Sequence, residues 1–512
     1  MTNLTAASKI NETRPIGASR WALLFIAFVT STVYAMTLLV VSVILPQIQG
    51  SLSATPDQIA WTMTFNILAT AIMTPISGWL ANRFGARNLM MFCMAGFGLS
   101  SLACGLATSL EALIIFRILQ GGLGAPLVPI PQAVVLAAFP KSQHAMATSI
   151  YGMGVVIGPI LGPVYGGYLA ELYGWRSAFF MIAPIAAAIL VGIYFLIPKD
   201  TKRITAKFTW FGFLALSTGL TCLQLILDRG QRLDWLDSFE INTEIIIGLI
   251  AISIFFAHSK LSQTPLLDLR HLKNWNYILG LLIVTIYGML NFTPMVMLPP
   301  MLKNLGGYPE TIIGTLVSFR GVGAVLGFLI AGWMGKLDPR ITLTLGHIIQ
   351  AWTGWVMWNF NADVAAVDIL LVSTIQGICV GIIWVPLTVS TFSRIDPHDF
   401  SETSAIYHLL RNIGSSIFIS ISVTTVIRSQ TINYAQLGEF ITPLNEAFVK
   451  FSTITGINIT RDTDVAQLSA MVNEQAQLIG FLNSFGLYTV VCLVALPLVW
   501  MIRPAKELSE KE

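Results

Sequence analysis

The amino-acid sequence predicts an all-α, polytopic membrane protein. Of its 512 residues, 55% are hydrophobic and only 11% are charged, whereas soluble globular domains carry about 25% charged residues. Apolar runs of about 20 residues, the length at which a helix crosses a bilayer, recur along the chain. Such a chain cannot cover its surface with water-facing groups. We therefore expect it to lie in the lipid bilayer, without a nucleic-acid partner.

Polar breaks divide the chain into about fourteen apolar runs of membrane-spanning length. The first begins at Trp21; it is too long for a signal-peptide core, and no small-residue cleavage site follows it. We expect it to remain as a span. The predicted spans are 21–44, 58–78, 88–107, 112–138, 146–170, 177–197, 208–227, 242–258, 276–298, 311–333, 342–360, 366–391, 402–426 and 479–502.

Basic residues indicate the orientation of the spans. With the N-terminus in the cytoplasm, the cytoplasmic segments hold 19 of the 29 Lys and Arg residues, the opposite loops hold 7, and 3 lie within spans. Cytoplasmic loops are enriched in Lys and Arg, so both termini are expected there. The largest segment on the opposite, periplasmic side is 428–478, whose apolar residues recur at roughly helical spacing and predict a short amphipathic hairpin.

Three motifs occur twice in the same order along the chain. The pairs are GWLANRFGAR (78–87) and GWMGKLDPR (332–340), QGGLGAPLVPI (120–130) and QGICVGIIWVPL (376–387), and SIYGMG (149–154) and SAIYHLL (404–410). These echoes indicate two related six-helix halves with an inserted helix pair between them. The expected organisation is a tail at 1–20, a half at 21–200, an inserted pair at 201–260, a half at 261–502 and a tail at 503–512.

These motifs resemble those of the major facilitator superfamily, and specifically its fourteen-helix drug:proton antiporter branch, typified by the EmrB and QacA exporters. The first loop is similar to the superfamily motif G-x-L-A-D-R-x-G-R-R, and RILQGGLGA (117–125) to R-x-x-Q-G-x-G-A. GVVIGPILGPVYGG (154–167) is similar to the antiporter motif G-x-x-x-G-P-x-x-G-P-x-x-G-G. The resemblance implies the major facilitator fold and a transporter, not an enzyme, with no cofactor or bound metal.

The resemblance also implies a conformational latch at the duplicated loop. In the family, the loop acid caps a facing helix and bonds to arginine, but in this chain Asn82 stands at the acid's position. The expected latch residues are Gly78, Asn82, Arg83, Gly85, Arg87, Asp338 and Arg340.

The antiporter motif predicts a helix face that a second helix can approach closely. Glycine recurs there every four residues, which leaves one face without side chains, and prolines beside it can bend the helix. The motif residues are Gly154, Gly158, Pro159, Gly162, Pro163, Gly166 and Gly167. From the resemblance, we expect this face at the close interface between the two halves.

The first span lacks the acid on which the branch usually depends for coupling to protons. The branch carries L-D-x-T-I-V-N-V-A-L-P, whereas this chain reads MTLLVVSVILP (36–46), with Thr37 in place of aspartate, and no acid lies near the middle of a predicted span. The candidates for coupling are Arg117 and Gln120 from the family motif, the span-end acids Asp228 and Glu402, and His408, whose imidazole titrates near neutral pH. Alternatively, the protein is not coupled to protons in the usual way of the family.

A charged side chain within a span normally faces a cavity or a partner. A cavity with Arg117 and no central acid would suit neutral or anionic amphiphiles better than cations. Two further arginines, Arg320 and Arg411, lie nearer span ends, where anchoring and function are equally compatible with the sequence. The candidate cavity residues are Tyr34, Thr37, Trp61, Asn66, Gln132, Tyr287, Asn291, Met295 and Trp384.

The sequence thus predicts a secondary active exporter in a bacterial inner membrane. It would move amphiphilic toxic compounds outward by alternating access, driven by protons, with a periplasmic adaptor and an outer-membrane channel as hypothetical partners. The alternatives are an exporter of an anionic metabolite, fatty acid or siderophore, and a non-transporting membrane sensor with the same fold. The glycines of GVGAVLG (321–327) do not predict a nucleotide site, because they lie inside an apolar run with no preceding strand.

Overall fold

The computed structural model describes residues 18–199, 208–262, 266–361 and 363–503. The tails predicted at 1–20 and 503–512 lie almost entirely outside these ranges, as does the start of the inserted segment 201–260. The described residues form a bundle of long α-helices and contain no strand. The predicted all-α architecture is confirmed.

Each predicted span corresponds to one helix or to two consecutive helices. In the first half these are α2 (Ala18–Leu52), α3 (Pro56–Phe84), α4 (Ala86–Leu106), α5 (Leu110–Gly124) with η1 (Ala125–Leu127) and α6 (Pro129–Ala138), α7 (His144–Tyr173), and α8 (Trp175–Phe180) with α9 (Ile182–Leu196). The inserted pair is α10 (Trp210–Arg229) and α11 (Phe239–Leu261). The second half comprises α12 (Trp275–Asn304), α13 (Glu310–Trp333), α14 (Pro339–Trp358), α15 (Ala366–Phe392), α16 (Phe400–Glu439), α17 (Glu446–Thr455) and α18 (Asp462–Trp500). Short 3-10 turns occupy the connections at η2 (Lys141–Gln143), η3 (Trp235–Asp237), η4 (Leu269–Lys273), η5 (Met334–Lys336) and η6 (Pro397–Asp399).

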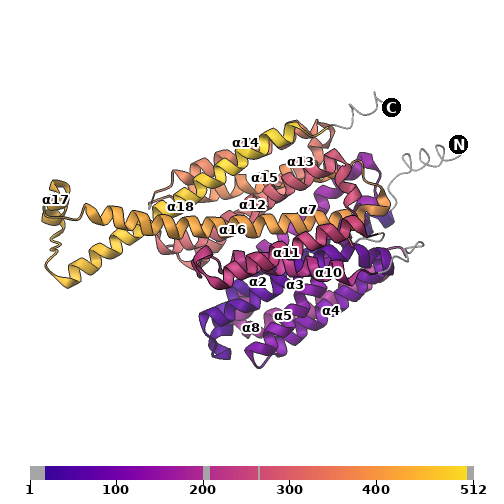
Figure 1. Cartoon of the computed structure of the whole chain (residues 1–512), viewed down its shortest axis with the longest axis horizontal. Coiled ribbons are helices and arrows are strands. Elements are labelled where there is room, and N and C mark those ends of the chain that lie inside the picture. Colours follow the sequence, from indigo (N-terminus) through magenta and orange to yellow (C-terminus); the bar gives the residue numbers. More distant parts are fainter. Residues whose placement is uncertain (1–17, 200–207, 263–265, 362, 504–512) are drawn as a thin grey trace.

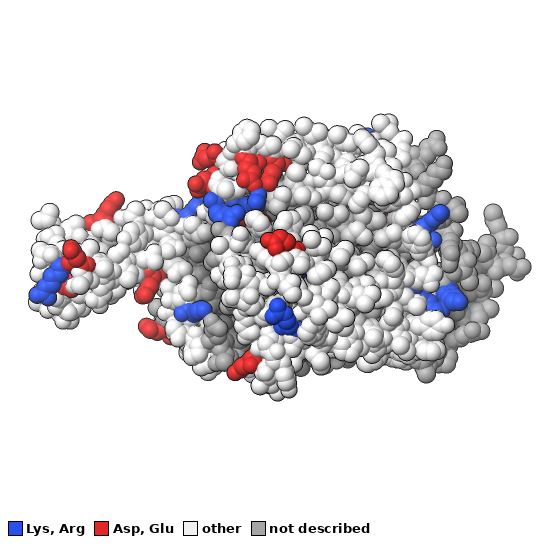
Figure 2. All heavy atoms as spheres, turned by 90° about the horizontal axis from the view of Figure 1, so that it is seen from below, with Lys and Arg blue, Asp and Glu red and all other residues white. Residues whose placement is uncertain are grey.

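Thirteen of the helical segments described are long and apolar enough to cross a membrane. The helix missing from this set is α14, at the predicted span 342–360, where polar residues such as His347 and Gln350 lower the mean hydropathy. It nevertheless packs against α15 and α18 and exposes Trp352 and Trp355 on its outer face. On the face in Figure 2, a band without Lys, Arg, Asp or Glu separates the charged side chains at the two ends of the body, as a lipid-facing belt would.

The two halves repeat the same helix pairs. In the first half α2 packs on α7, α3 on α5 and α4 on α9, and in the second half α12 packs on α16, α13 on α15 and α14 on α18. The inserted helices α10 and α11 pack on each other, and α10 also contacts α3 and α16, one helix from each half. The structure therefore has two six-helix halves and an inserted pair.

The predicted segment 428–478 is more regular than a loop. α16 continues to Glu439 and α18 begins at Asp462, so both helices project beyond the bundle and α17 lies at their tip (Figure 1). Hydrogen bonds join the two projecting helices, with Gln430 Nε2 donating to Asn473 Oδ1 at 2.8 Å. We call this segment, residues 428–478, the projecting hairpin.

Close helix contacts in both halves require glycine. A Cβ on Gly121 of α5 would lie 2.3 Å from the carbonyl oxygen of Asn66 on α3. A Cβ on Gly377 of α15 would lie 2.0 Å from the carbonyl oxygen of Arg320 on α13. Small residues are what let helix backbones approach this closely in a membrane, so each half places a glycine at the crossing of its second and fourth spans.

We expect Gly377→Ala to destabilise the fold by about 1–3 kcal/mol, the usual cost of over-packing a tight contact. The matched control is Gly314→Ala on α13, because a Cβ there meets no atom within 4 Å. Thermal unfolding of the purified protein in detergent checks this. Equal stability of the two variants would contradict the close contact at Gly377.

Candidate functional site

The duplicated loops bring the two halves together at the end of the bundle where the described chain begins and ends (Figure 1). A Cβ on Gly78 of α3 would lie 2.5 Å from the Cα of Glu402 on α16. In the second copy, a Cβ on Gly332 of α13 would lie 3.2 Å from the hydroxyl of Ser149 on α7. Both glycines therefore let a helix of one half approach a helix of the other.

The arginines of the duplicated loops act within their own halves. Arg87 donates a hydrogen bond to the carbonyl of Tyr194 near the end of α9, and its guanidinium lies 4.8 Å from the centre of the Tyr194 ring. Arg340 Nε donates to the carbonyl of Ile502, just beyond α18, at 2.5 Å. Because carbonyls at a helix C-terminus attract positive charge, each arginine fixes the last helix of its half.

The other predicted latch residues have local roles. Gly85 has a φ of 88° and forms the turn between α3 and α4. Asp338 caps α14, accepting a hydrogen bond from the backbone N–H of Arg340 at 2.9 Å. Neither Asn82 nor Arg83 forms a side-chain hydrogen bond to another described residue. The contact between the halves at these loops therefore rests on the glycines and their backbone neighbours.

The glycine face of the antiporter motif packs inside the first half. Added Cβ atoms on Gly158 and Gly162 would lie 2.6 Å and 2.4 Å from carbonyl oxygens of Thr32 and Met36 on α2. Gly154 and Gly166 likewise meet α2, which corrects the expectation that this face joins the two halves. The side chain of Pro163 lies outside the described residues. A different face of α7, which carries Val155, Val156, Pro159 and Ile160, is turned toward the second half.

Arg117 is enclosed by polar partners within the first half. Its guanidinium donates to Gln120 Oε1 at 2.5 Å and to the carbonyl of Thr62 at 3.3 Å. Gln120 donates in turn to the hydroxyl of Ser101 at 2.7 Å, and Asn66 donates to the Arg117 carbonyl at 2.8 Å. Arg117 and Gln120 thus lie together, as the motif predicts, but they do not line the pocket described below.

The remaining coupling candidates lie apart from one another. His408 Nε2 is hydrogen-bonded to Gln132 Oε1, which joins α16 to α6 across the halves, and His408 Nδ1 is buried without a partner. Asp228, near the end of α10, accepts a hydrogen bond from Thr64 of α3 at 2.8 Å.

Glu402 lies in the first turn of α16, directly against Gly78. Its carboxylate accepts a hydrogen bond from the backbone N–H of Asp268, in the connection between α11 and α12. Arg270 hydrogen-bonds to the Asp268 carboxyl and lowers its pKa below the usual value. Glu402 is therefore the coupling candidate that lies against the first copy of the duplicated loop, where α3 of the first half meets α16 of the second.

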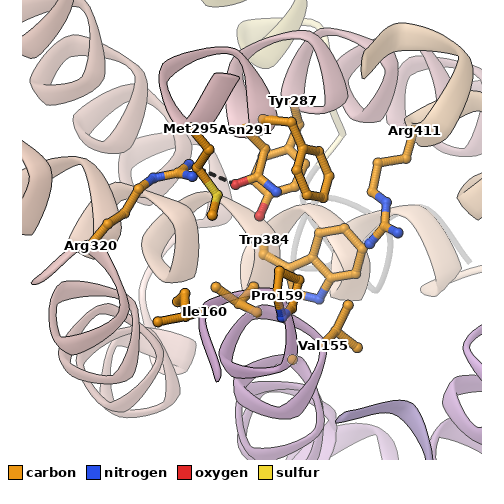
Figure 3. Close-up of a pocket in the computed structure, with 12 residues that line it drawn as sticks. Val155, Pro159, Ile160, Tyr287, Asn291, Met295, Arg320, Trp384 and Arg411 are labelled. Carbon is orange, nitrogen blue, oxygen red and sulfur yellow. Dashed lines mark hydrogen bonds between the residues drawn. The ribbon is translucent and has the colours of Figure 1, made fainter. Parts of the chain in front are cut away.

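A pocket lies between the halves, beside the middle of α7, α12 and α13. It is narrow, with a free volume of about 20 Å³, and it is enclosed by α7 of the first half and by α12, α13, α15 and α16 of the second. The labelled residues in Figure 3 are Val155, Pro159, Ile160, Tyr287, Asn291, Met295, Arg320, Trp384 and Arg411. Apolar side chains of α7 thus face aromatic and polar side chains of the second half.

Four of the nine predicted cavity residues line this pocket, namely Tyr287, Asn291, Met295 and Trp384. The other five lie elsewhere in the first half. Four of them form hydrogen bonds inside the bundle: Tyr34 with Thr70, Thr37 with the Tyr34 carbonyl, Asn66 with the Arg117 carbonyl, and Gln132 with His408. The fifth, Trp61, is 40% exposed. The pocket is therefore built mainly from the second half.

Arg320 and Arg411 are pocket residues that sequence reasoning did not place in the cavity. They enter from opposite sides in Figure 3, Arg320 from α13 and Arg411 from α16. Arg320 donates to Asn291 Oδ1 at 2.9 Å, and the Arg411 guanidinium lies 5.4 Å from the centre of the Trp384 ring. The sequence feature that could have identified them is their position inside apolar runs, where a charged side chain normally faces a cavity or a partner.

Comparisons with known proteins agree with this architecture. The multidrug export protein EmrB of Escherichia coli strain K12 is 29% identical over 500 residues, which cover 97% of this chain and 98% of that protein. The fatty acid resistance protein FarB of Neisseria gonorrhoeae is 28% identical over 468 residues, covering 91% and 92%. The crystal structure of the human organic anion transporter MFSD10 superposes with a TM-score of 0.62 at 13% identity, covering 95% of this chain and 100% of that one.

The family follows from a match that extends over most of the chain. The family model for the Major Facilitator Superfamily matches residues 23–419. This range includes both copies of the duplicated loop and the residues that line the pocket. The chain belongs to the major facilitator superfamily.

Proposed function

We propose that this protein is a secondary active exporter that moves amphiphilic compounds out of a bacterial cell by alternating access, driven by protons. The observation that carries the proposal is the pocket between the halves, together with the hydrogen bonds and close glycine contacts that join the halves at the end of the bundle with the duplicated loops. If the halves separated at those contacts and came together on the other side of the pocket, the pocket would open to the opposite side of the membrane. The names of the relatives, which refer to multidrug export and to fatty acid resistance, support export.

The moving parts would be the two halves, residues 21–200 and 261–502. On the closed side, Ser404 of α16 donates to the carbonyl of Pro129 at 3.0 Å, and Lys141 donates to the carbonyl of Ser393 at 3.3 Å. These are single hydrogen bonds, each worth about 0.5–1.5 kcal/mol, so a modest change in charge or ligand binding can shift the balance. These hydrogen bonds, together with the glycine contacts at the duplicated loops, would act as the latch.

We place the protein in the inner membrane with both chain ends in the cytoplasm. The closed side would then be cytoplasmic, and the projecting hairpin would extend into the periplasm. Two side-chain hydrogen bonds join its two helices, one between Gln430 and Asn473 and one between Tyr434 and Ser469, each at 2.8 Å. A rigid hairpin of this kind suits contact with a periplasmic adaptor and, through it, an outer-membrane channel.

Glu402 is our proposed proton-carrying residue. It lies in the first turn of a helix, where the helix dipole favours a negative charge, and it touches Gly78 across the halves. The charged and titratable groups around it are Asp268, Asp399, Arg270 and Tyr277. Taking up a proton would neutralise the carboxylate and weaken its hydrogen bond to the Asp268 N–H within the second half, which would free the first turn of α16 to move against Gly78.

We expect purified protein in liposomes to move an amphiphilic dye when a pH gradient is imposed. The dyes are ethidium (cationic), Nile red (neutral) and 8-anilinonaphthalene-1-sulfonate (anionic), and the readout is their fluorescence against protein-free liposomes. A proton ionophore should abolish the movement. If no dye moves in response to the gradient, proton-driven export is excluded.

We expect Glu402→Gln to abolish gradient-driven dye movement but to preserve dye exchange without a gradient, because the amide cannot carry a proton. Asp228→Asn should behave as wild type, because Asp228 lies away from the contact between the halves. His408→Asn tests the competing carrier. Gradient-driven movement that survives Glu402→Gln and disappears in either of the other variants would reject the role of Glu402.

A further inference from the structure

The pocket carries positive charge that the protein does not neutralise. Among the described residues, three arginines are buried, Arg117, Arg320 and Arg411, while no Asp or Glu is. Two of the three, Arg320 and Arg411, line the pocket. An unpaired charge in a low-dielectric interior is costly, so this arrangement needs a physical reason.

The contrast with Arg117 shows that the pocket arginines are incompletely bonded. Arg117 has both a side-chain and a backbone acceptor, at 2.5 and 3.3 Å. Arg320 has one acceptor, Asn291 Oδ1, and its Nε is buried without a partner. Among the described residues, the only hydrogen-bond acceptor of the Arg411 guanidinium is the amide oxygen of Asn412, at 3.2 and 3.4 Å, at or beyond the long end of the usual range.

The surroundings of these two guanidinium groups are apolar and aromatic. Val155, Pro159 and Ile160 of α7 face the pocket from below in Figure 3, and Trp384 and Tyr287 lie between the two arginines. The pocket therefore combines donors that lack acceptors with a surface suited to a hydrocarbon or aromatic tail. That is the pattern of a site for an amphiphile with a polar head group.

We propose that this pocket binds the anionic head group of an amphiphile, a carboxylate or sulfonate, at Arg320 and Arg411. The proposal rests on the proposed export function and names its substrate class. Guanidinium groups pair with carboxylates through strong charge-assisted hydrogen bonds. An anion would supply the acceptor that Arg320 Nε lacks, and its tail would lie along α7 and Trp384 once the halves move apart to admit it.

A cationic amphiphile fits this pocket poorly. It would bring a third positive charge beside two arginines, with no carboxylate in the described residues lining the site. A neutral amphiphile would leave both guanidinium groups unpaired. Charge complementarity therefore predicts that the pocket binds an anionic amphiphile most tightly, a neutral one less tightly and a cationic one least tightly.

The test measures binding alone, in lipid nanodiscs and without any gradient. The probes are decanoate, decanol and decyltrimethylammonium, and the readout is tryptophan fluorescence, with empty nanodiscs as the blank. We expect decanoate to bind most tightly, and Arg320→Gln and Arg411→Gln each to weaken it by about tenfold or more, the loss of one hydrogen bond to a charged group. Arg320→Lys should retain part of the affinity.

Two controls keep the result interpretable. Arg428→Gln removes an exposed arginine of the projecting hairpin and should leave decanoate binding unchanged. Unchanged decanol binding in Arg320→Gln shows that the pocket is still folded. Decyltrimethylammonium binding as tight as decanoate, or Arg320→Gln binding decanoate like wild type, would overturn the proposal. Because no transport is measured, anion binding without gradient-driven movement would refute the export function alone.

Discussion

Contact between helix backbones at glycine is the interaction on which the rest of this structure depends. Lipid tails give helices no hydrophobic reason to associate, so close packing at small residues has to hold them together. Gly121 and Gly377 set the helix crossings inside the two halves, and Gly158 and Gly162 fix α7 on α2. Gly78 joins the halves at the duplicated loop. With its glycine face committed to α2, α7 is left to present its other face, with Val155 and Pro159, to the second half. The pocket is the space that these contacts leave between the halves.

Charge gives that space its chemistry. A membrane protein can hold a buried arginine where partners surround it, as they surround Arg117. Arg320 and Arg411 have weaker or fewer partners among the described residues, with Arg320 Nε lacking an acceptor, and both line the pocket. In this chain, Thr37 in the first span and Asn82 in the duplicated loop stand where the family has acids, and the loss of these acids has two consequences. The pocket has no carboxylate among the described residues to attract a cation, and under our proposal proton coupling lies instead at the edge of the bundle, where Glu402 touches Gly78. The duplicated loop in this chain works through its glycines and through arginines that fix the last helix of each half.

Much of the fold could be predicted from the sequence, because the length of an apolar run determines whether it can span a bilayer. The repeat was also predictable, because equivalent residues of the two halves are the same number of positions apart in the sequence. Gly78 and Gly332 are as far apart in sequence as Asn66 and Arg320, whose carbonyls meet equivalent glycines. The side on which each helix meets its neighbours was not predictable. Glycine spacing identifies a face of α7 but not the helix that covers it, and the covering helix is α2. In the same way, the sequence places Arg320 within a span but does not reveal that its Nε lacks an acceptor.

The most direct measurement of the central claim is a cryo-electron microscopy map of the protein in lipid nanodiscs, saturated with 8-anilinonaphthalene-1-sulfonate. The account predicts that the sulfonate lies within hydrogen-bonding distance of the Arg320 or Arg411 guanidinium, with the rings against Val155, Pro159 and Trp384. A sulfonate bound away from both arginines, or arginines paired with protein carboxylates in that map, would contradict it.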